Sequence, residues 1–424
     1  MLNRIPKINL HLHLDGSFRM DTIWKLAHDQ NVQMPAETIE DYEAFIRKCA
    51  NAKDVNEYLK MFDTPLKCMQ DKASITRITE ELIEDLARQG YIYAEIRFAP
   101  QLHTQKGLTQ AGATEAVLEG RNNALKKYPK LRIGILTCMM CIGIDTLNQK
   151  ENMETVEVCK QYLGKGVVGI DLAGAEGFVP LSNFGTLFAK AKEYGLPMTC
   201  HAGDSQGPDT VKDAMDFGVT RIGHGHHVYF DQELVERAKE NKVLFEICPT
   251  SNVQCQTVPS YAKHPMKPLY DQGVLVSVNT DNDTFAGVHI TDEYAHCIND
   301  MGFTVDDIFQ MNINAANAAF VTEEERKEFK ELQPYQFAAI AFVMHSIMIK
   351  QQTAVTRANS TWDCLLEAFG VSDATAIYNY IKGTAKLATA TAAKTIAKVC
   401  LKRLGGVMTV GYSIYEFVTC MKEK

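Results

Sequence analysis

The sequence lacks the features that mark a membrane-spanning or disulfide-rich protein. Residues 1–6 contain no apolar core of signal-peptide length. The apolar stretch at 337–349 has 13 residues, fewer than a transmembrane helix needs. The twelve cysteines are scattered without the spacing of a disulfide framework. We therefore expect a cytoplasmic protein with reduced thiols.

Two further absences narrow the kinds of site. Cys138 and Cys141 form a single CxxC motif, and without a second pair they favour packing inside an apolar strand over a zinc ribbon. No glycine-rich phosphate loop follows the first predicted strand, which argues against a dinucleotide-binding open sheet.

Charge is distributed unevenly along the chain. Hydrophobic residues make up 46% of it and charged residues 23%, which is typical of a soluble globular protein. Residues 331–424 carry 10 Lys and Arg against 6 Asp and Glu, although the whole chain has a net charge of -8. The acidic main body argues against nucleic acid as a partner.

The stretch Lys7 to Ser17 contains two histidines separated by one residue. Successive side chains of a strand point to opposite faces, so His11 and His13 share one face. The two imidazoles could converge on one metal ion, or they could be half-buried side chains of an ordinary strand. This stretch alone favours neither interpretation.

Short apolar segments and helical patterns alternate along the first 282 residues. Eight such units predict a (β/α)₈ TIM-type barrel, and a doubly wound open sheet is the alternative. After the strand that holds His11, we expect strands at 91–100, 131–140, 167–174, 197–204, 221–225, 244–249 and 274–282. Helices are expected at 20–30, 55–69, 75–89, 114–127, 154–163, 182–194, 209–217, 231–241 and 265–272.

Polar residues and glycine gather where five of these strands end. In a barrel, the carboxyl ends of the strands form one ring and carry the chemistry. We therefore expect one site that contains His11, His13, Gly174, His201, Asp204, His224, Asp281 and Asn282.

The motifs around these residues resemble those of the adenosine deaminase family of zinc-dependent metal hydrolases. The matching stretches are LHLHLDGS at 10–17, YAEIRFAP at 93–100, DLAG at 171–174, HAGD at 201–204, RIGHG at 221–225, FEICP at 245–249 and NTDN at 279–282. Their order and spacing hold from about residue 5 to about residue 328. We expect a deaminase-like barrel at 1–330 and a helical C-terminal extension at 331–424.

The resemblance implies one zinc ion held by His11, His13, His201 and Asp281. Three imidazoles and one carboxylate form a borderline-soft donor set that suits Zn²⁺ and leaves a position for water. The resemblance further implies that His224 and Asp281 orient and deprotonate this water, which then attacks C6 of a purine. For His224 the alternative is a buried, hydrogen-bonded structural histidine.

The resemblance also assigns substrate contacts. The backbone N–H of Gly174 is implied to meet N3 of the base, and Asp15 to accept the ribose 5′-hydroxyl. His13 and Asn282 complete the expected substrate-binding set. A 5′-phosphate beside Asp15 would be repelled, so the nucleoside is favoured over AMP.

Two residues depart from the family pattern. Asn282 stands where many relatives have Asp, and an amide can donate to N7 of the base at any pH. Asp204 stands where the usual residue is Glu, the acid that protonates N1. Since Asp is one methylene shorter, we expect Asp204 to deliver the proton less efficiently than Glu. His226, His227 and His264 lie near the ring, and we expect supporting or structural roles for them.

The extension matches no family that we recognise. Residues 374–404 space apolar side chains along one helical face and carry lysines elsewhere. Packing on the barrel or self-association is the first expectation, contact with an anionic membrane surface the second and a membrane span the third.

The expected function is zinc-dependent deamination of adenosine and 2′-deoxyadenosine to the inosine forms. The alternatives are another 6-aminopurine as the substrate, such as adenine or a modified nucleoside, or a non-catalytic scaffold that binds nucleoside.

Overall fold

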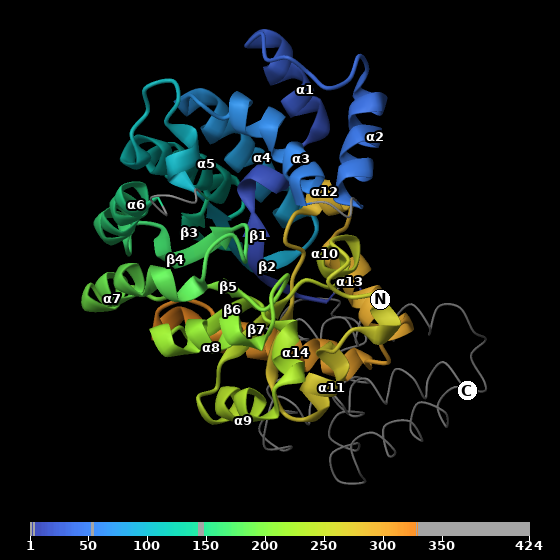
Figure 1. Ribbon diagram of the computed structural model, residues 1–424. Coiled ribbons are helices and arrows are strands. Elements are labelled where there is room, and N and C mark those ends of the chain that lie inside the picture. The colour runs from blue at the N-terminus through green and yellow to red at the C-terminus, as the bar shows by residue number, and fades with distance from the viewer. Residues whose placement is uncertain (1, 3–4, 52–54, 143–147, 328, 330–424) are drawn as a thin grey trace, which may run out of the picture.

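Eight parallel strands occupy the centre of the computed structural model, and helices surround them (Figure 1). The structure describes residues 2, 5–51, 55–142, 148–327 and 329. The strands are β1 (Lys7–His13), β2 (Tyr91–Phe98), β3 (Arg132–Cys141), β4 (Val167–Gly174), β5 (His201–Ala202), β6 (Arg221–His224), β7 (Leu244–Ile247) and β8 (Leu275–Val278). Strands β1 to β4 pair in sequence order in one sheet, and β5 to β8 pair in the same way in a second.

Two seams join these sheets into a closed barrel. At the first seam, the Ile170 N–H donates to the Pro197 carbonyl at 2.9 Å and the Thr199 N–H donates to the Ile170 carbonyl at 3.0 Å. At the second seam, the His13 N–H donates to the Asp281 carbonyl at 2.7 Å and the Asp281 N–H donates to the His11 carbonyl at 2.9 Å. The predicted (β/α)₈ barrel is confirmed, and the end of β8 lies beside β1.

Strand β5 is much shorter than the strand expected at 197–204. Gly203 turns the chain with a φ of +66°, a conformation that glycine adopts without strain. The N–H groups that follow donate to the carboxylate of Glu176, at 2.6 Å from Gly203, 3.0 Å from Asp204 and 2.8 Å from Ser205. Asp204 therefore lies on a loop that Glu176 holds, and not within a strand.

The expected helices are all present, with ends that differ by at most five residues. They are α1 (Met20–Asp29), α3 (Val55–Cys68), α4 (Lys72–Arg88), α5 (Gln110–Lys127), α6 (Gln149–Tyr162), α7 (Gly185–Glu193), α8 (Pro208–Phe217), α9 (Gln232–Glu240) and α11 (Met266–Asp271). Five helices were not expected: α2 (Ile39–Ala50), α10 (Pro249–Gln254), α12 (Asp283–Ala286), α13 (Ile290–Asn299) and α14 (Val305–Ala318). Within the part of the chain that the structure describes, none of the helices is long and apolar enough to cross a membrane. The helical extension expected at 331–424 lies outside the described residues.

The interior of the barrel carries charged side chains. Arg97 on β2 reaches Asp171 on β4 at 2.8 Å and Glu246 on β7 at 2.7 Å. Arg221 on β6 pairs with Glu246 at 2.8 Å and also with Glu95 on β2. All five side chains are fully buried, so these pairs join four strands in a water-free environment where an unpaired charge is costly.

Candidate active site

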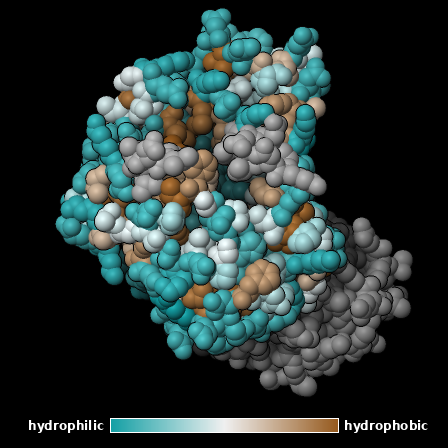
Figure 2. Space-filling model, viewed as in Figure 1, coloured by the Kyte–Doolittle hydropathy of each residue, from teal (hydrophilic) through white to brown (hydrophobic). Residues whose placement is uncertain are grey.

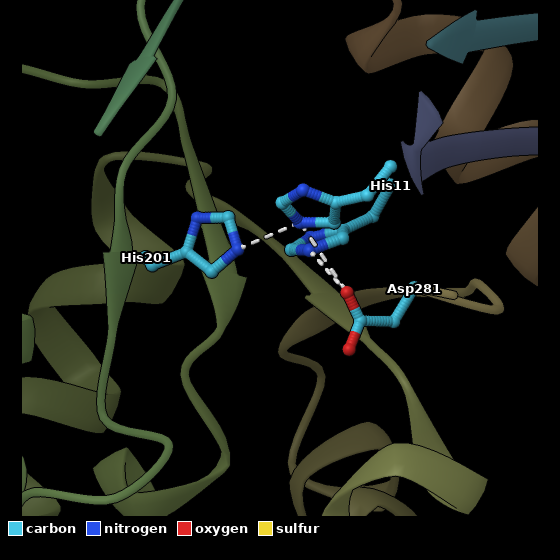
Figure 3. A group of neighbouring side chains, drawn as sticks. His11, His201 and Asp281 are labelled. Atoms are coloured by element: carbon cyan, nitrogen blue, oxygen red, sulfur yellow. Dashed lines mark hydrogen bonds and ion pairs between the residues drawn. The ribbon is translucent and has the colours of Figure 1, made fainter. Parts of the chain in front are cut away.

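Four side chains meet at the carboxyl end of the barrel (Figure 3). His11 and His13 come from β1 and Asp281 from the end of β8, which the second seam places beside β1. His201 comes from β5, and its ring points toward the same centre. The Nε2 atom of His13 lies 3.2 Å from the Nε2 atom of His201 and 3.3 Å from Oδ1 of Asp281, and Nε2 of His11 lies 3.4 Å from that oxygen.

This geometry fits a metal ion. The four ligand atoms all lie within 4.8 Å of one another. Atoms placed tetrahedrally at about 2.0–2.1 Å from one zinc ion would lie about 3.3–3.4 Å apart, close to the contacts seen. The Nε2 atom of His11 is buried and makes no hydrogen bond, which is costly for a polar atom unless a ligand satisfies it. The cluster could therefore hold a metal ion.

Buried carboxylates orient two of the imidazoles from behind. Nδ1 of His11 lies 3.0 Å from Oε2 of Glu246, and Nδ1 of His201 lies 3.0 Å from Oδ2 of Asp171. A carboxylate on Nδ1 keeps the proton on that atom and directs the bare Nε2 forward, which is the usual support of a metal-binding histidine. Burial would raise the pKa of Glu246, but Arg97 and Arg221 outweigh it and hold the pKa well below its usual range.

Asp281 is held from two sides. The Ser251 hydroxyl of α10 donates to Oδ2 at 2.7 Å, which leaves Oδ1 directed at the histidines. The backbone of Asp281 has a φ of 62°, an uncommon conformation for a residue other than glycine. The peptide hydrogen bonds of the second seam maintain it. The carboxylate is therefore fixed before any ligand arrives.

His224 ends β6 and lies beside the cluster. Its ring centroid lies 4.9 Å from that of His11 and 5.4 Å from that of His201. Its φ is 58°, so the chain bends sharply there and turns the ring inward. Burial lowers the pKa of His224 to about 4, which favours the neutral imidazole at physiological pH.

Asp204 faces the pocket from the loop after β5. Its Oδ1 accepts hydrogen bonds from the Asn252 amide at 2.8 Å and from the Thr257 hydroxyl at 3.1 Å. Burial raises the pKa of Asp204 and the nearby charge of Asp281 adds to the rise, although both hydrogen bonds oppose it. A carboxyl group with a raised pKa keeps its proton more readily, as a general acid must.

A pocket of about 320 Å³ opens in front of these groups, a size within the usual range for small-molecule sites. Figure 2 shows a hollow in this face of the molecule, with hydrophobic side chains at its edge. Aromatic and aliphatic side chains form one wall: Tyr58, Phe62, Leu66, Leu102 and Met140. Among the described residues that line the pocket there is no lysine or arginine, whereas Asp15, Asp63, Asp204 and Asp281 line it.

The structure brings the residues predicted from the sequence together. His13, Asp15, Gly174, His201, Asp204, His224, Asp281 and Asn282 line the pocket, and His11 lies behind His13. Asp15 is buried, and burial raises its pKa to about 6. Gly174 has a φ of +109°, and a Cβ there would lie 2.8 Å from the Cys141 carbonyl oxygen, so only glycine fits at this position.

Sequence reasoning assigned no role to several residues that hold the site. Arg97, Asp171 and Glu246 orient the imidazoles, Ser251 and Asn252 hold the two aspartates, and Glu176 holds the loop of Asp204. Charged residues in the middle of apolar strands were the available signal for the first three. His264 contacts Asn252, and His226 is buried beside His264.

A barrel of parallel strands with three histidines and an aspartate at their carboxyl ends has the donor set and the site position of a metal-dependent hydrolase. The family model described as Adenosine deaminase matches residues 6–332. A protein of Haemophilus ducreyi named adenosine deaminase is 38% identical over 323 residues, which cover 76% of this chain and 93% of that protein. One of Clostridium kluyveri with the same name is 35% identical over 332 residues, which cover 78% and 94%.

Among solved structures, the Arabidopsis N6-mAMP deaminase is similar with a TM-score of 0.70 at 28% identity. The match covers 78% of this chain and 98% of that one. The chain belongs to the adenosine deaminase family and is a deaminase.

Replacement of a cluster histidine tests the metal site. His13→Ala removes one of the four donors. Loss of a group that supports a metal ligand typically lowers metal affinity by about 10–100-fold, and we expect loss of the ligand itself to lower it further. Elemental analysis after dialysis against a chelator measures the metal content. His28→Ala, an exposed change on α1, is the matched control and should keep its metal. Full metal occupancy in the His13 variant would contradict the assignment.

Proposed function

We propose that this protein hydrolyses adenosine and 2′-deoxyadenosine to inosine and 2′-deoxyinosine plus ammonia. One zinc ion held by His11, His13, His201 and Asp281 serves the reaction. The observation that supports this most directly is the convergence of these four donors beside a pocket that also presents Asp204 and His224. Relatives named adenosine deaminase at 35–38% identity support the same reaction.

Each residue around the cluster has its own part in the reaction. A zinc ion in this site would act as a Lewis acid that makes water nucleophilic near neutral pH. Asp281 and His224 would orient the attacking water, and one of the two would accept its proton. Asp204 donates a proton to N1 of the purine, because electron density moves onto N1 when C6 is attacked. The apolar wall and the Gly174 backbone hold the base in place.

Charge in the pocket selects a nucleoside over a nucleotide. Asp15 and Asp63 line the pocket together with the two acidic groups of the reaction, and no cationic side chain among the described lining residues offsets them. A 5′-phosphate would meet like charges, which cost several kcal/mol when brought together (about 10²-fold or more in affinity). The Arabidopsis neighbour is named as a deaminase of N6-mAMP, a nucleotide, so a shared fold does not decide this preference.

We further propose that residues 1–330 form the catalytic unit and that the extension takes no part in the chemistry. Every proposed site residue lies before residue 283. Phe329, at the end of the described chain, is buried, and its ring centroid lies 5.0 Å from that of Tyr93 on β2. The family model ends at residue 332.

Substrate preference tests the proposed function. The unaltered protein loaded with zinc should convert adenosine to inosine, followed by the absorbance change, and should process AMP at least about 10²-fold less efficiently. Asp15→Ala should lower kcat/KM for adenosine by about 10–10²-fold, since a lost buried hydrogen bond costs about 1–3 kcal/mol. Asp15→Asn removes only the charge and should narrow the gap between AMP and adenosine. Equal efficiency on both substrates in the unaltered protein would contradict this role of Asp15.

Replacement of Asp204 tests the proton donor. Asp204→Asn keeps the shape and the acceptor oxygen that Asn252 and Thr257 require, but has no acid proton. We expect kcat to fall by about 10²–10⁴-fold, the usual contribution of a general acid. Asp204→Glu retains an acid and should retain measurable turnover. Near-normal kcat in the Asn variant would show that the proton comes from another group.

Truncation tests the division of the chain. A protein that ends at residue 332 should keep its zinc and a kcat within about twofold of the full chain. A protein that ends at residue 327 also loses Phe329 and should be less stable by about 3–5 kcal/mol, the typical cost of removing a buried phenylalanine side chain. Denaturant unfolding and turnover measure the two effects. Loss of turnover in a folded, zinc-loaded 1–332 chain would contradict the proposal.

A further inference from the structure

Asn252 on α10 connects the two catalytic groups that flank the pocket. Its side chain is fully buried. Its Nδ2 lies 2.8 Å from Oδ1 of Asp204 and 2.9 Å from Nδ1 of His224. Its Oδ1 lies 3.2 Å from Nε2 of His264. An amide nitrogen has two hydrogens, and both are therefore used here.

A backbone N–H sets the direction of this network. The Met266 N–H donates to Nδ1 of His264 at 3.1 Å, so that nitrogen is an acceptor and carries no proton. The proton of His264 is then on Nε2, which donates to Oδ1 of Asn252. The amide oxygen is thereby placed toward His264, and the NH₂ group must face Asp204 and His224. Burial lowers the pKa of His264 to about 3, in agreement with a single ring proton.

The direction of these hydrogen bonds fixes which atoms of His224 and Asp204 carry a proton. An amide N–H can only donate, so Nδ1 of His224 is an acceptor and the ring proton is on Nε2. Oδ1 of Asp204 already accepts from Asn252 and from the Thr257 hydroxyl. The acid proton of Asp204 is then on Oδ2, the oxygen that these donors leave free.

We propose that Asn252 is a positioning residue of the deaminase reaction, which fixes His224 as the Nε2–H tautomer and orients the proton of Asp204 on Oδ2. The proposal rests on the proposed function, and it gives separate roles to His224 and Asp281, which that function treats together. Because Nε2 of His224 already carries a proton, it donates to the attacking oxygen and orients it. The proton that the water loses goes to the carboxylate of Asp281, and the proton of Asp204 goes to N1. Asp281 then passes its proton to the amino group at C6, the C6–N bond breaks and ammonia leaves. The proton of the hydroxyl now on C6 returns to Asp204, which leaves the C6 carbonyl of inosine.

The tautomer of His224 is the most direct test. Long-range ¹H–¹⁵N correlation spectra of the zinc-loaded protein labelled at histidine distinguish a bare ring nitrogen from a protonated one. Loss of signals in His224→Gln assigns the residue. In the unaltered protein we expect a bare Nδ1 and a protonated Nε2. A proton on Nδ1 would overturn the proposal whether or not any variant folds.

Asn252→Asp supplies the kinetic test. The new side chain keeps the size of asparagine, and in its ionised form it can only accept hydrogen bonds. His224 should then move its proton to Nδ1, and the acid of Asp204 loses a donor. We expect kcat to fall by about 10²-fold, as for a misplaced catalytic group, while KM for adenosine changes by less than about threefold. A purely structural role would lower stability and leave the tautomer unchanged.

Gln254→Glu is the matched control, because it makes the same amide-to-acid change two residues away on α10. Gln254 donates to the Ala286 carbonyl and contacts neither catalytic group. This variant should keep the tautomer and a kcat within about threefold. Unchanged kcat in the folded Asn252 variant would overturn the proposal. An Nε2–H tautomer in an unaltered protein that does not turn over adenosine would instead contradict the proposed substrate.

Discussion

The site depends on the ion pairs that the buried guanidinium of Arg97 makes. The guanidinium lies between Asp171 and Glu246, and these carboxylates in turn hold His201 and His11. Each charge is tolerable in the barrel interior only because the others are present, since an isolated buried ion costs several kcal/mol. The network therefore forms as a unit. It ties β2, β4 and β7 to the two strands that carry the imidazoles, and it sets the ring orientation from behind.

Much of the fold follows from patterns that any barrel would show. Strand β4 begins and ends where its apolar run predicts, and the residues at the strand ends converge because parallel strands share one direction. The predicted C-terminal end of strand β5 was wrong because Glu176 accepts hydrogen bonds from the N–H groups of Gly203 and Asp204, which a longer strand would have used. The short helix α10 was missed because its residues Thr250 to Asn252 are typical of loops.

Some residues of the candidate site could likewise be predicted from the local sequence, whereas others depend on contacts between distant parts of the chain. The proposed metal donors could be predicted because His11 and His13 share one face of a strand and a resemblance to a known family located the other two. The residues that hold these side chains in place could not be predicted, because a buried asparagine such as Asn252 looks like any other polar residue until its partners are known. Asp204 shows the consequence: its side chain is short, but Asn252, Thr257 and the loop that Glu176 holds fix its place. Preorganisation of this kind reduces the entropy lost when a catalytic group must adopt one geometry.

The seam between β1 and β8 also constrains how the protein is made. Two of the proposed donors, His11 and His13, leave the ribosome well before Asp281, whose carboxylate follows some 270 residues later. A nascent chain can present histidines to passing metals long before the carboxylate exists. Closing so long a loop carries a large entropic cost, which the seam hydrogen bonds and the buried charges must offset together. Assembly of the four proposed donors is therefore a late event in the life of the chain, and the order of synthesis itself delays it until the barrel can close.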